Sequence, residues 1–121
     1  MEEIPKPIRD RRRSVRVQES LLFTIGQPDA GGEIEAVTIN ISAHGAMCIT
    51  NRDVPVMTQL DIKLPIPAAS GSTKTIHARG VVVRREKDPI APRFRLAIFF
   101  SQIKPKDLSV LQEFIDRRTK A

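Results

Sequence analysis

Two short stretches of the chain carry groups suited to holding a small anionic nucleotide. The first is a run of arginines at Arg11, Arg12, Arg13 and Arg16, whose planar guanidinium groups can grip phosphate and the O6/N7 edge of guanine. The second is the segment 40–45, Asn-Ile-Ser-Ala-His-Gly. It offers an amide, a hydroxyl and a glycine that lets a ligand approach the backbone closely. Together they predict a binding site for such a nucleotide.

Each stretch has a plain structural explanation when it is taken alone. Arginine runs occur in solvated basic arms, and Asn, Ser and Gly are common in turns for conformational reasons. Arg12 and Arg16 would lie about 13 Å apart on an extended chain, which could span a compact nucleotide with two phosphates. The two stretches flank the first predicted hairpin, about 25 residues apart, and this pairing favours a shared site.

The elements that must position these residues are mostly short strands. Polar and apolar residues alternate from Val15 to Ile25, and the second predicted strand runs from Glu33 to Ile41. Four further strands are predicted over 46–50, 60–66, 73–85 and 94–100. Glycine, proline and asparagine lie between these segments and indicate turns.

The second predicted strand decides which way the candidate ligand groups face. Val37, Ile39 and Ile41 share one face of a period-two strand, so we expect them to point inward. Asn40 and Ser42 share the other face and are expected to point outward. Gly45 is expected where a positive φ or a close approach of ligand requires a residue without Cβ.

Only the C-terminal part of the chain has a helical period. Leu108, Leu111, Phe114 and Ile115 follow Pro105 at spacings of three and four, which predicts an amphipathic helix over about 105–118 with a core-facing stripe. We therefore predict a mainly β domain over 13–121: a small six-stranded antiparallel barrel with one C-terminal helix. Residues 1–12, rich in charge and proline, are expected to form a flexible basic arm.

The composition of the chain limits its domain number, its partners and its location. A chain of 121 residues with a net charge of +6 is expected to form one domain that favours anionic partners. No apolar run is long enough for a membrane-spanning helix, and the N-terminus lacks the pattern of a secretory signal. The single Cys48 lies in an apolar run, so we expect a buried thiol and a cytoplasmic protein.

Other chemistries lack support in the residue pattern. His44, His77 and Cys48 are too scattered for a metal site, and no catalytic triad order, carboxylate pair or phosphate-binding glycine loop is present. We therefore expect no enzyme, no metal and no cofactor. Proteins that bind single-stranded nucleic acid stack bases on aromatic rings. A chain with five Phe and no Trp or Tyr is poorly suited to that role.

In their order and spacing the two stretches resemble the motifs of the PilZ domain family, whose members are receptors for the bacterial second messenger cyclic di-GMP. Residues 11–16 match RRxxxR, and residues 40–45 match [DN]xSxxG. Residues 78–84 resemble the family's valine-rich strand that ends in arginine. Residues 94–100 resemble its closing strand, with Ala97 in place of the usual glycine.

The resemblance implies a function and a set of ligand contacts. The implied contacts are Arg11, Arg12, Arg16, Asn40, Ser42 and Gly45. The first motif would grip phosphate and guanine, the second would hold the other edge of the ligand, and Arg11 resembles a position that favours an intercalated pair of ligand molecules. Ligand binding would order the arm over the barrel and regulate a protein partner. A barrel that binds single-stranded nucleic acid, or a ligand-free interaction module, remain the alternatives.

Overall fold

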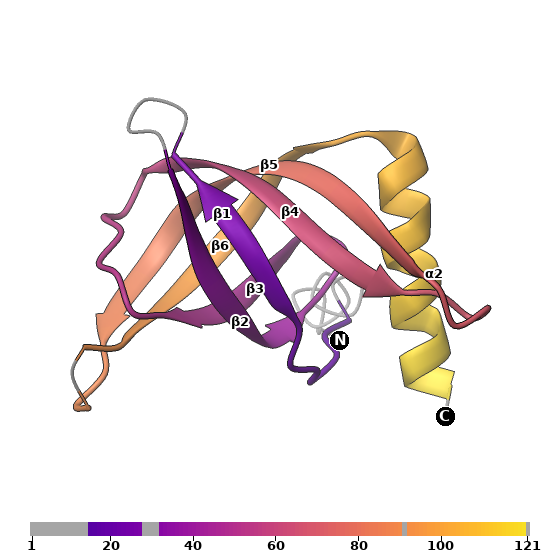
Figure 1. Ribbon diagram of the computed structural model, residues 1–121, viewed down its shortest axis with the longest axis horizontal. Helices are drawn as coiled ribbons and strands as arrows, with labels where there is room; N and C mark the ends of the chain where they lie inside the picture. The colour runs from indigo at the N-terminus through magenta and orange to yellow at the C-terminus, as the bar shows by residue number, and fades with distance from the viewer. Residues whose placement is uncertain (1–14, 28–31, 91, 121) are drawn as a thin grey trace, which may run out of the picture.

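Six strands form a closed antiparallel barrel with a helix packed at one end (Figure 1). The computed structural model describes residues 15–27, 32–90 and 92–120, so the predicted arm at 1–12 and Arg11, Arg12 and Arg13 lie outside the described residues. The elements are β1 (Leu22–Gly26), β2 (Glu33–Ile41), β3 (Gly45–Thr50), β4 (Gln59–Pro67), β5 (Thr73–Lys87), β6 (Phe94–Ile103) and α2 (Pro105–Lys120). The prediction of a six-stranded barrel with a C-terminal helix is confirmed.

The strands follow one another around the barrel in the order β1-β2-β3-β6-β5-β4. Pairing of Ile25 with Ile62 joins β1 to β4 and closes the sheet into a barrel. The core fills the interior with aliphatic side chains from every strand. In β4 the predicted alternation holds throughout, because Leu60, Ile62, Leu64 and Ile66 are all buried.

The inward face of β2 differs from the prediction. Val37 is 40% exposed, whereas Ala36 and Thr38 point into the barrel. The register with β3 shifts between Thr38 and Asn40, and this bulge adds one residue to the strand. The extra residue, Ile39, is half-buried, and the face that points inward changes there, so Ile41 is fully buried.

The segment before β1 is fixed to β2 without being a continuous strand. Val17 exchanges two backbone hydrogen bonds with Ile41, at 2.9 and 3.0 Å. The buried hydroxyl of Thr38 accepts a hydrogen bond from the Leu21 amide at 2.8 Å and donates one to the carbonyl oxygen of Glu19. The prediction of a strand from Val15 is therefore wrong over 15–21, because tertiary contacts at two points replace the regular ladder.

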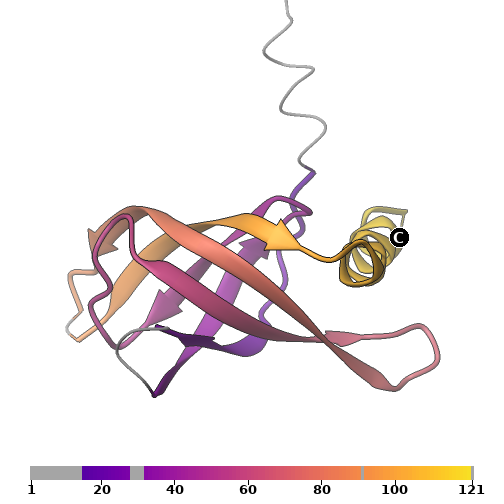
Figure 2. The same cartoon turned by 90° about the horizontal axis from the view of Figure 1, so that it is seen from above.

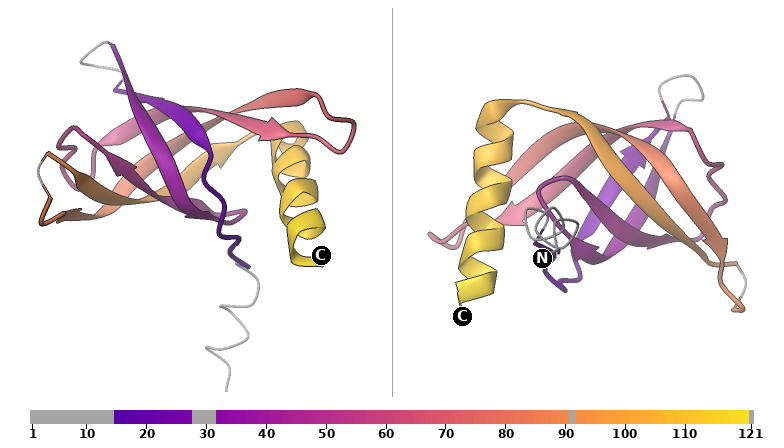
Figure 3. Two further views of the ribbon diagram at one scale, coloured as in Figure 1. Left: turned by 60° about the horizontal axis from the view of Figure 1, so that its bottom comes forward. Right: turned by 180° about the vertical axis from the view of Figure 1, so that it is seen from behind.

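Helix α2 packs on the barrel through the predicted apolar stripe. Leu111, Phe114 and Ile115 are buried, and the helix contacts β5 and β4. Asp107 in its first turn accepts a hydrogen bond from the His77 amide at 3.1 Å. In Figures 2 and 3 the residues just before β1 lie at the same end of the barrel as α2. There Arg118 of the helix pairs with Glu19 at 3.1 Å.

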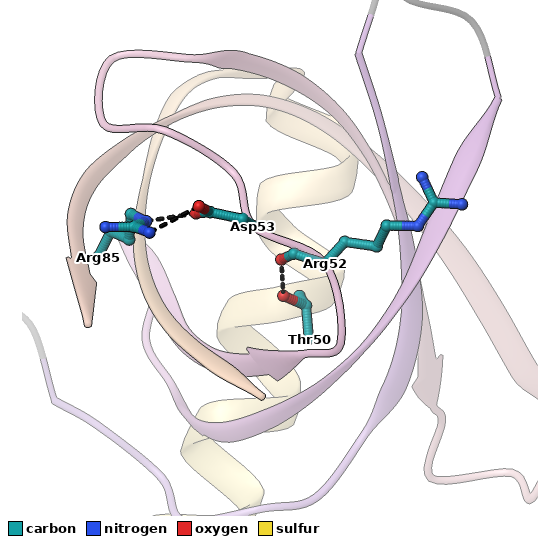
Figure 4. A network of polar contacts seen from close by, with 4 residues as sticks. All are labelled: Thr50, Arg52, Asp53 and Arg85. Atoms are coloured by element: carbon teal, nitrogen blue, oxygen red, sulfur yellow. Dashed lines mark hydrogen bonds and ion pairs between the residues drawn. The ribbon is translucent and has the colours of Figure 1, made fainter. Parts of the chain in front are cut away.

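The opposite end of the barrel is held by a polar network (Figure 4). Arg85 forms a two-pronged ion pair with Asp53, with one contact at 2.6 Å, and its guanidinium lies 5.6 Å from the centre of the Phe94 ring. The hydrogen bond from Arg85 lowers the pKa of Asp53. Thr50 donates to the carbonyl of Arg52 at 2.6 Å. These contacts fix the loop between β3 and β4.

Cys48 is fully buried, as predicted, and this burial raises the pKa of its thiol to about 12. Among the described residues, no helix is both long enough and apolar enough to cross a membrane.

Candidate functional site

The two motifs meet at a hydrogen bond between Arg16 and Asn40. Arg16 lies next to Val17, whose backbone pairs with Ile41 at the end of β2. This pairing places the guanidinium beside Asn40, and Nη1 of Arg16 donates to Oδ1 of Asn40 at 2.7 Å. Residues 24 positions apart in the chain therefore present one surface.

Asn40 faces outward, as predicted, although the reason is the bulge rather than simple alternation. It pairs with Met47 of β3 just after the register shift, and its side chain is partly exposed. An amide oxygen has two lone pairs. The Arg16 contact uses one of them, which leaves acceptor capacity for a second donor.

The expected outward orientation of Ser42 is wrong. Its side chain is fully buried, and Oγ accepts a hydrogen bond from the His44 amide at 3.1 Å and donates to the Gly45 carbonyl at 3.3 Å. The Ser42 amide also donates to the same carbonyl at 2.8 Å. The chain leaves β2 after Ile41, so strand alternation no longer determines where position 42 points.

Gly45 is required by its packing against β6, and the positive φ that was one of its two predicted reasons is wrong. Its φ is not positive, and the group that approaches it closely belongs to β6. A Cβ at this position would lie 2.2 Å from the carbonyl oxygen of Ile98, which is a severe steric overlap. The His44 carbonyl accepts from the Phe100 amide at 2.8 Å, so the turn rests directly on β6.

The second motif therefore divides into two roles. Asn40 presents a polar group on the outer surface, while Ser42 and Gly45 build the turn that ends β2 against β6. Arg11 and Arg12 lie outside the described residues, so their part in the site stays a prediction. The residues that the sequence did not reveal are Thr38 and Glu19, which anchor the segment carrying Arg16. Their contacts depend on the bulge, which no period-two pattern shows.

Other clusters of polar residues lie away from this surface. In the described part of the chain, no three His, Cys, Asp or Glu side chains come together as metal ligands. An open pocket of about 450 Å³ lies across β4, β5 and the connection to α2, with Lys63, His77, Arg79 and Lys104 in its wall. Its charges include the Arg79–Asp61 ion pair. Because it contains neither Arg16 nor Asn40, it is separate from the candidate site.

Comparisons with known proteins agree with the architecture. A family model described as PilZ domain matches residues 10–117. The structure of the Bacillus subtilis inhibitor of motility, MotI/DgrA, superposes with a TM-score of 0.77 and 24% identity, covering 90% of this chain and 51% of that chain. The chain thus spans about half the length of that protein.

A second solved structure is the PilZ domain of YcgR from Escherichia coli with c-di-GMP. It superposes with a TM-score of 0.63 and 16% identity, covering 91% of this chain and 92% of that chain. At these identities the likeness shows the fold alone. No match was found among curated proteins.

Proposed function

The chain belongs to the PilZ domain family, and we propose on this basis that it is a receptor for cyclic di-GMP that regulates a protein partner and catalyses no reaction. The observation that carries the proposal is the 2.7 Å hydrogen bond between Arg16 and Asn40. It joins one residue from each of the two family motifs on a single outer surface. The YcgR structure, which has the same fold, contains this ligand.

The chemistry of the paired side chains fits the ligand. Arg16 can donate to a phosphate or to the O6/N7 edge of guanine. The remaining acceptor capacity of the Asn40 oxygen suits the N1–H and N2 amine of a guanine. Because Asn40 already holds the guanidinium in place, less side-chain entropy is lost when the ligand binds.

The other motif residues take supporting roles in this proposal. Ser42 and Gly45 act through the turn that they build, which fixes Asn40 relative to β6. Arg11 and Arg12 add phosphate contacts from the arm, and Arg11 favours binding of an intercalated pair of ligand molecules.

The regulatory step is an ordering of the arm by its ligand. The ligand phosphates supply counter-charge to the arginines of the first motif, so the arm at residues 1–12 folds over the barrel when the ligand binds. The segment between the arm and β1 contacts α2 through the Glu19–Arg118 ion pair, so the ordered arm and the helix would together form the surface that the partner meets. The amide NMR signals of residues 1–12 should shift on saturation with cyclic di-GMP, and unchanged signals would refute this step.

The nucleic-acid alternative has less support from the side chains. All five phenylalanines lie in the described segments, and Phe99 is the one with an exposed ring. A groove that stacks successive bases needs several such rings.

Calorimetry with a panel of ligands tests the proposed receptor. The wild-type protein is titrated with cyclic di-GMP, GMP, cyclic GMP and a single-stranded oligonucleotide. We expect saturable binding of cyclic di-GMP alone. Binding of the oligonucleotide that weakens steeply with salt would instead support the nucleic-acid alternative. If none of these ligands binds, the protein is a ligand-free interaction module.

A further inference from the structure

Phe99 places an aromatic ring on the outer surface of β6, beside the turn of the second motif. Its side chain is 48% exposed, while the adjacent Ile98 and Phe100 point into the core. Phe99 pairs with Gly45 across the β3–β6 ladder. Since Gly45 has no side chain, no neighbour at the paired position covers the ring on the side of the turn.

The strand registers relate this ring to the candidate site. Asn40 pairs with Met47, and Met47 pairs with Ala97, two residues before Phe99. Asn40 and Phe99 are therefore two strands apart and two residues offset on the same outer face. Strand spacing and residue rise put their Cα atoms about 12 Å apart, a separation that a ligand with two bases can bridge.

Two neighbours of the ring on the outer face are apolar, and a positive charge lies beyond them. Val81 of β5 pairs with Phe99, and Ala97 lies on the same face of β6, so both neighbours are small or aliphatic. Arg84 pairs with Ala97 from the far side, is exposed, and makes no ion pair within the described residues. A platform between Arg16 on one side and Arg84 on the other suits an anionic ligand with planar rings.

We propose that Phe99 is a stacking platform for one guanine of cyclic di-GMP while Arg16 and Asn40 hold the other end of the ligand. This inference rests on the proposed function and adds a contact outside both family motifs. A base lying on an aromatic ring is stabilised by dispersion and by burial of both faces. A single exposed ring serves one base, which agrees with a dinucleotide and not with a long strand.

A single tryptophan tests the contact directly. The chain has no Trp and no Tyr, so Phe99→Trp introduces the sole indole, whose fluorescence a stacked guanine quenches. We expect saturable quenching by cyclic di-GMP with the midpoint that calorimetry gives for the same variant. The matched control is Ile90→Trp, at an exposed position in the β5–β6 loop, which should show no change on titration.

A second variant separates stacking from simple apolar contact. Phe99→Leu keeps an apolar side chain and removes the ring, and Phe99→Tyr keeps the ring. We expect Phe99→Leu to weaken cyclic di-GMP binding roughly 5- to 150-fold and Phe99→Tyr to bind close to wild type. Unchanged unfolding temperatures would confirm that these exposed substitutions leave the fold intact.

The two proposals fail in different ways. If wild type binds cyclic di-GMP while Phe99→Leu retains its affinity and the Phe99→Trp emission is unaffected, the platform is refuted and the receptor stands. If Phe99→Leu loses only the binding of a protein partner, the ring is a partner contact and the platform is likewise refuted. If wild type does not bind the ligand, both proposals fall.

Discussion

At Gly45 the neighbouring strand leaves room for a hydrogen atom and nothing larger. A methyl group there would meet the backbone of β6 at 2.2 Å, and backbone cannot rotate away as a side chain can. We expect Gly45→Ala to lower the free energy of unfolding by about 1–3 kcal/mol, measured by denaturant titration.

Gly26→Ala provides the matched control for this substitution. A Cβ at Gly26 would have its nearest neighbour at 3.6 Å, an ordinary contact, and no positive φ is required. We expect its stability to be unchanged or slightly raised, since alanine also reduces the entropy of the unfolded chain. Equal losses in the two variants would show that the close approach at Gly45 is not the cause.

Cys48 makes the stability of the barrel depend on alkaline pH. Burial raises the pKa of its thiol from 9.0 to about 12, so between these values the unfolded chain binds fewer protons than the folded one. Stability contributed by this group is complete below pH 9 and falls as the pH rises towards 12, by at most about 1.4 kcal/mol per pH unit.

Unfolding free energies measured from pH 8 to 11 test this contribution against Cys48→Ala. The alanine variant starts less stable because it loses buried volume. Its curve should nevertheless decline less steeply than that of wild type above pH 9. Parallel curves would contradict the raised pKa.

The bulge in β2 determines which of its side chains point into the barrel, and therefore which predictions for this strand are confirmed. Val37, Ile39 and Ile41 form a convincing apolar face in the sequence, whereas the true inward residues Ala36 and Thr38 are small or polar. Thr38 is acceptable in the core because its hydroxyl is satisfied by Leu21 and Glu19. That compensation comes from a segment 17 and 19 residues away, so no local pattern could reveal it.

The Thr38 contacts also anchor the segment that carries Arg16. Thr38→Val preserves shape but leaves the Leu21 amide without its acceptor, which costs about 1–3 kcal/mol of stability. Because that segment is then held less firmly, we expect cyclic di-GMP to bind several-fold more weakly, measured by calorimetry at a temperature where the variant remains folded.

Thr50→Val serves as the control at the other end of the barrel. Thr50 is equally buried and bonds the Arg52 carbonyl (Figure 4), far from Arg16. We expect it to reduce stability without changing the affinity for cyclic di-GMP. If both variants weaken binding alike, the effect is one of general stability and the anchoring role of Thr38 is refuted.

The overall architecture is well predicted by the sequence, because closure of the barrel needs only strand lengths, turns and an apolar face on each strand. Strand β4 illustrates this with its alternating apolar residues Leu60, Ile62, Leu64 and Ile66. The helical period of Leu111, Phe114 and Ile115 predicts α2, the helix that follows the strands. The candidate site is predictable in part. Asn40 faces outward as expected, but the burial of Ser42 follows from a turn packed on β6, which is a tertiary contact.

The proposed binding of cyclic di-GMP by the Arg16–Asn40 surface is tested by comparing the dissociation constants of three proteins. Wild type, Arg16→Ala and Arg79→Ala are titrated with cyclic di-GMP by calorimetry at one salt concentration. Arg79 of β5 is a matched control because it is also exposed and pairs with a neighbouring side chain, Asp61 of β4, at 3.3 Å. We predict a loss of about 10- to 150-fold in Arg16→Ala, the value of a charge-assisted hydrogen bond, and none in Arg79→Ala. Wild-type affinity in Arg16→Ala would show that this surface does not bind the ligand.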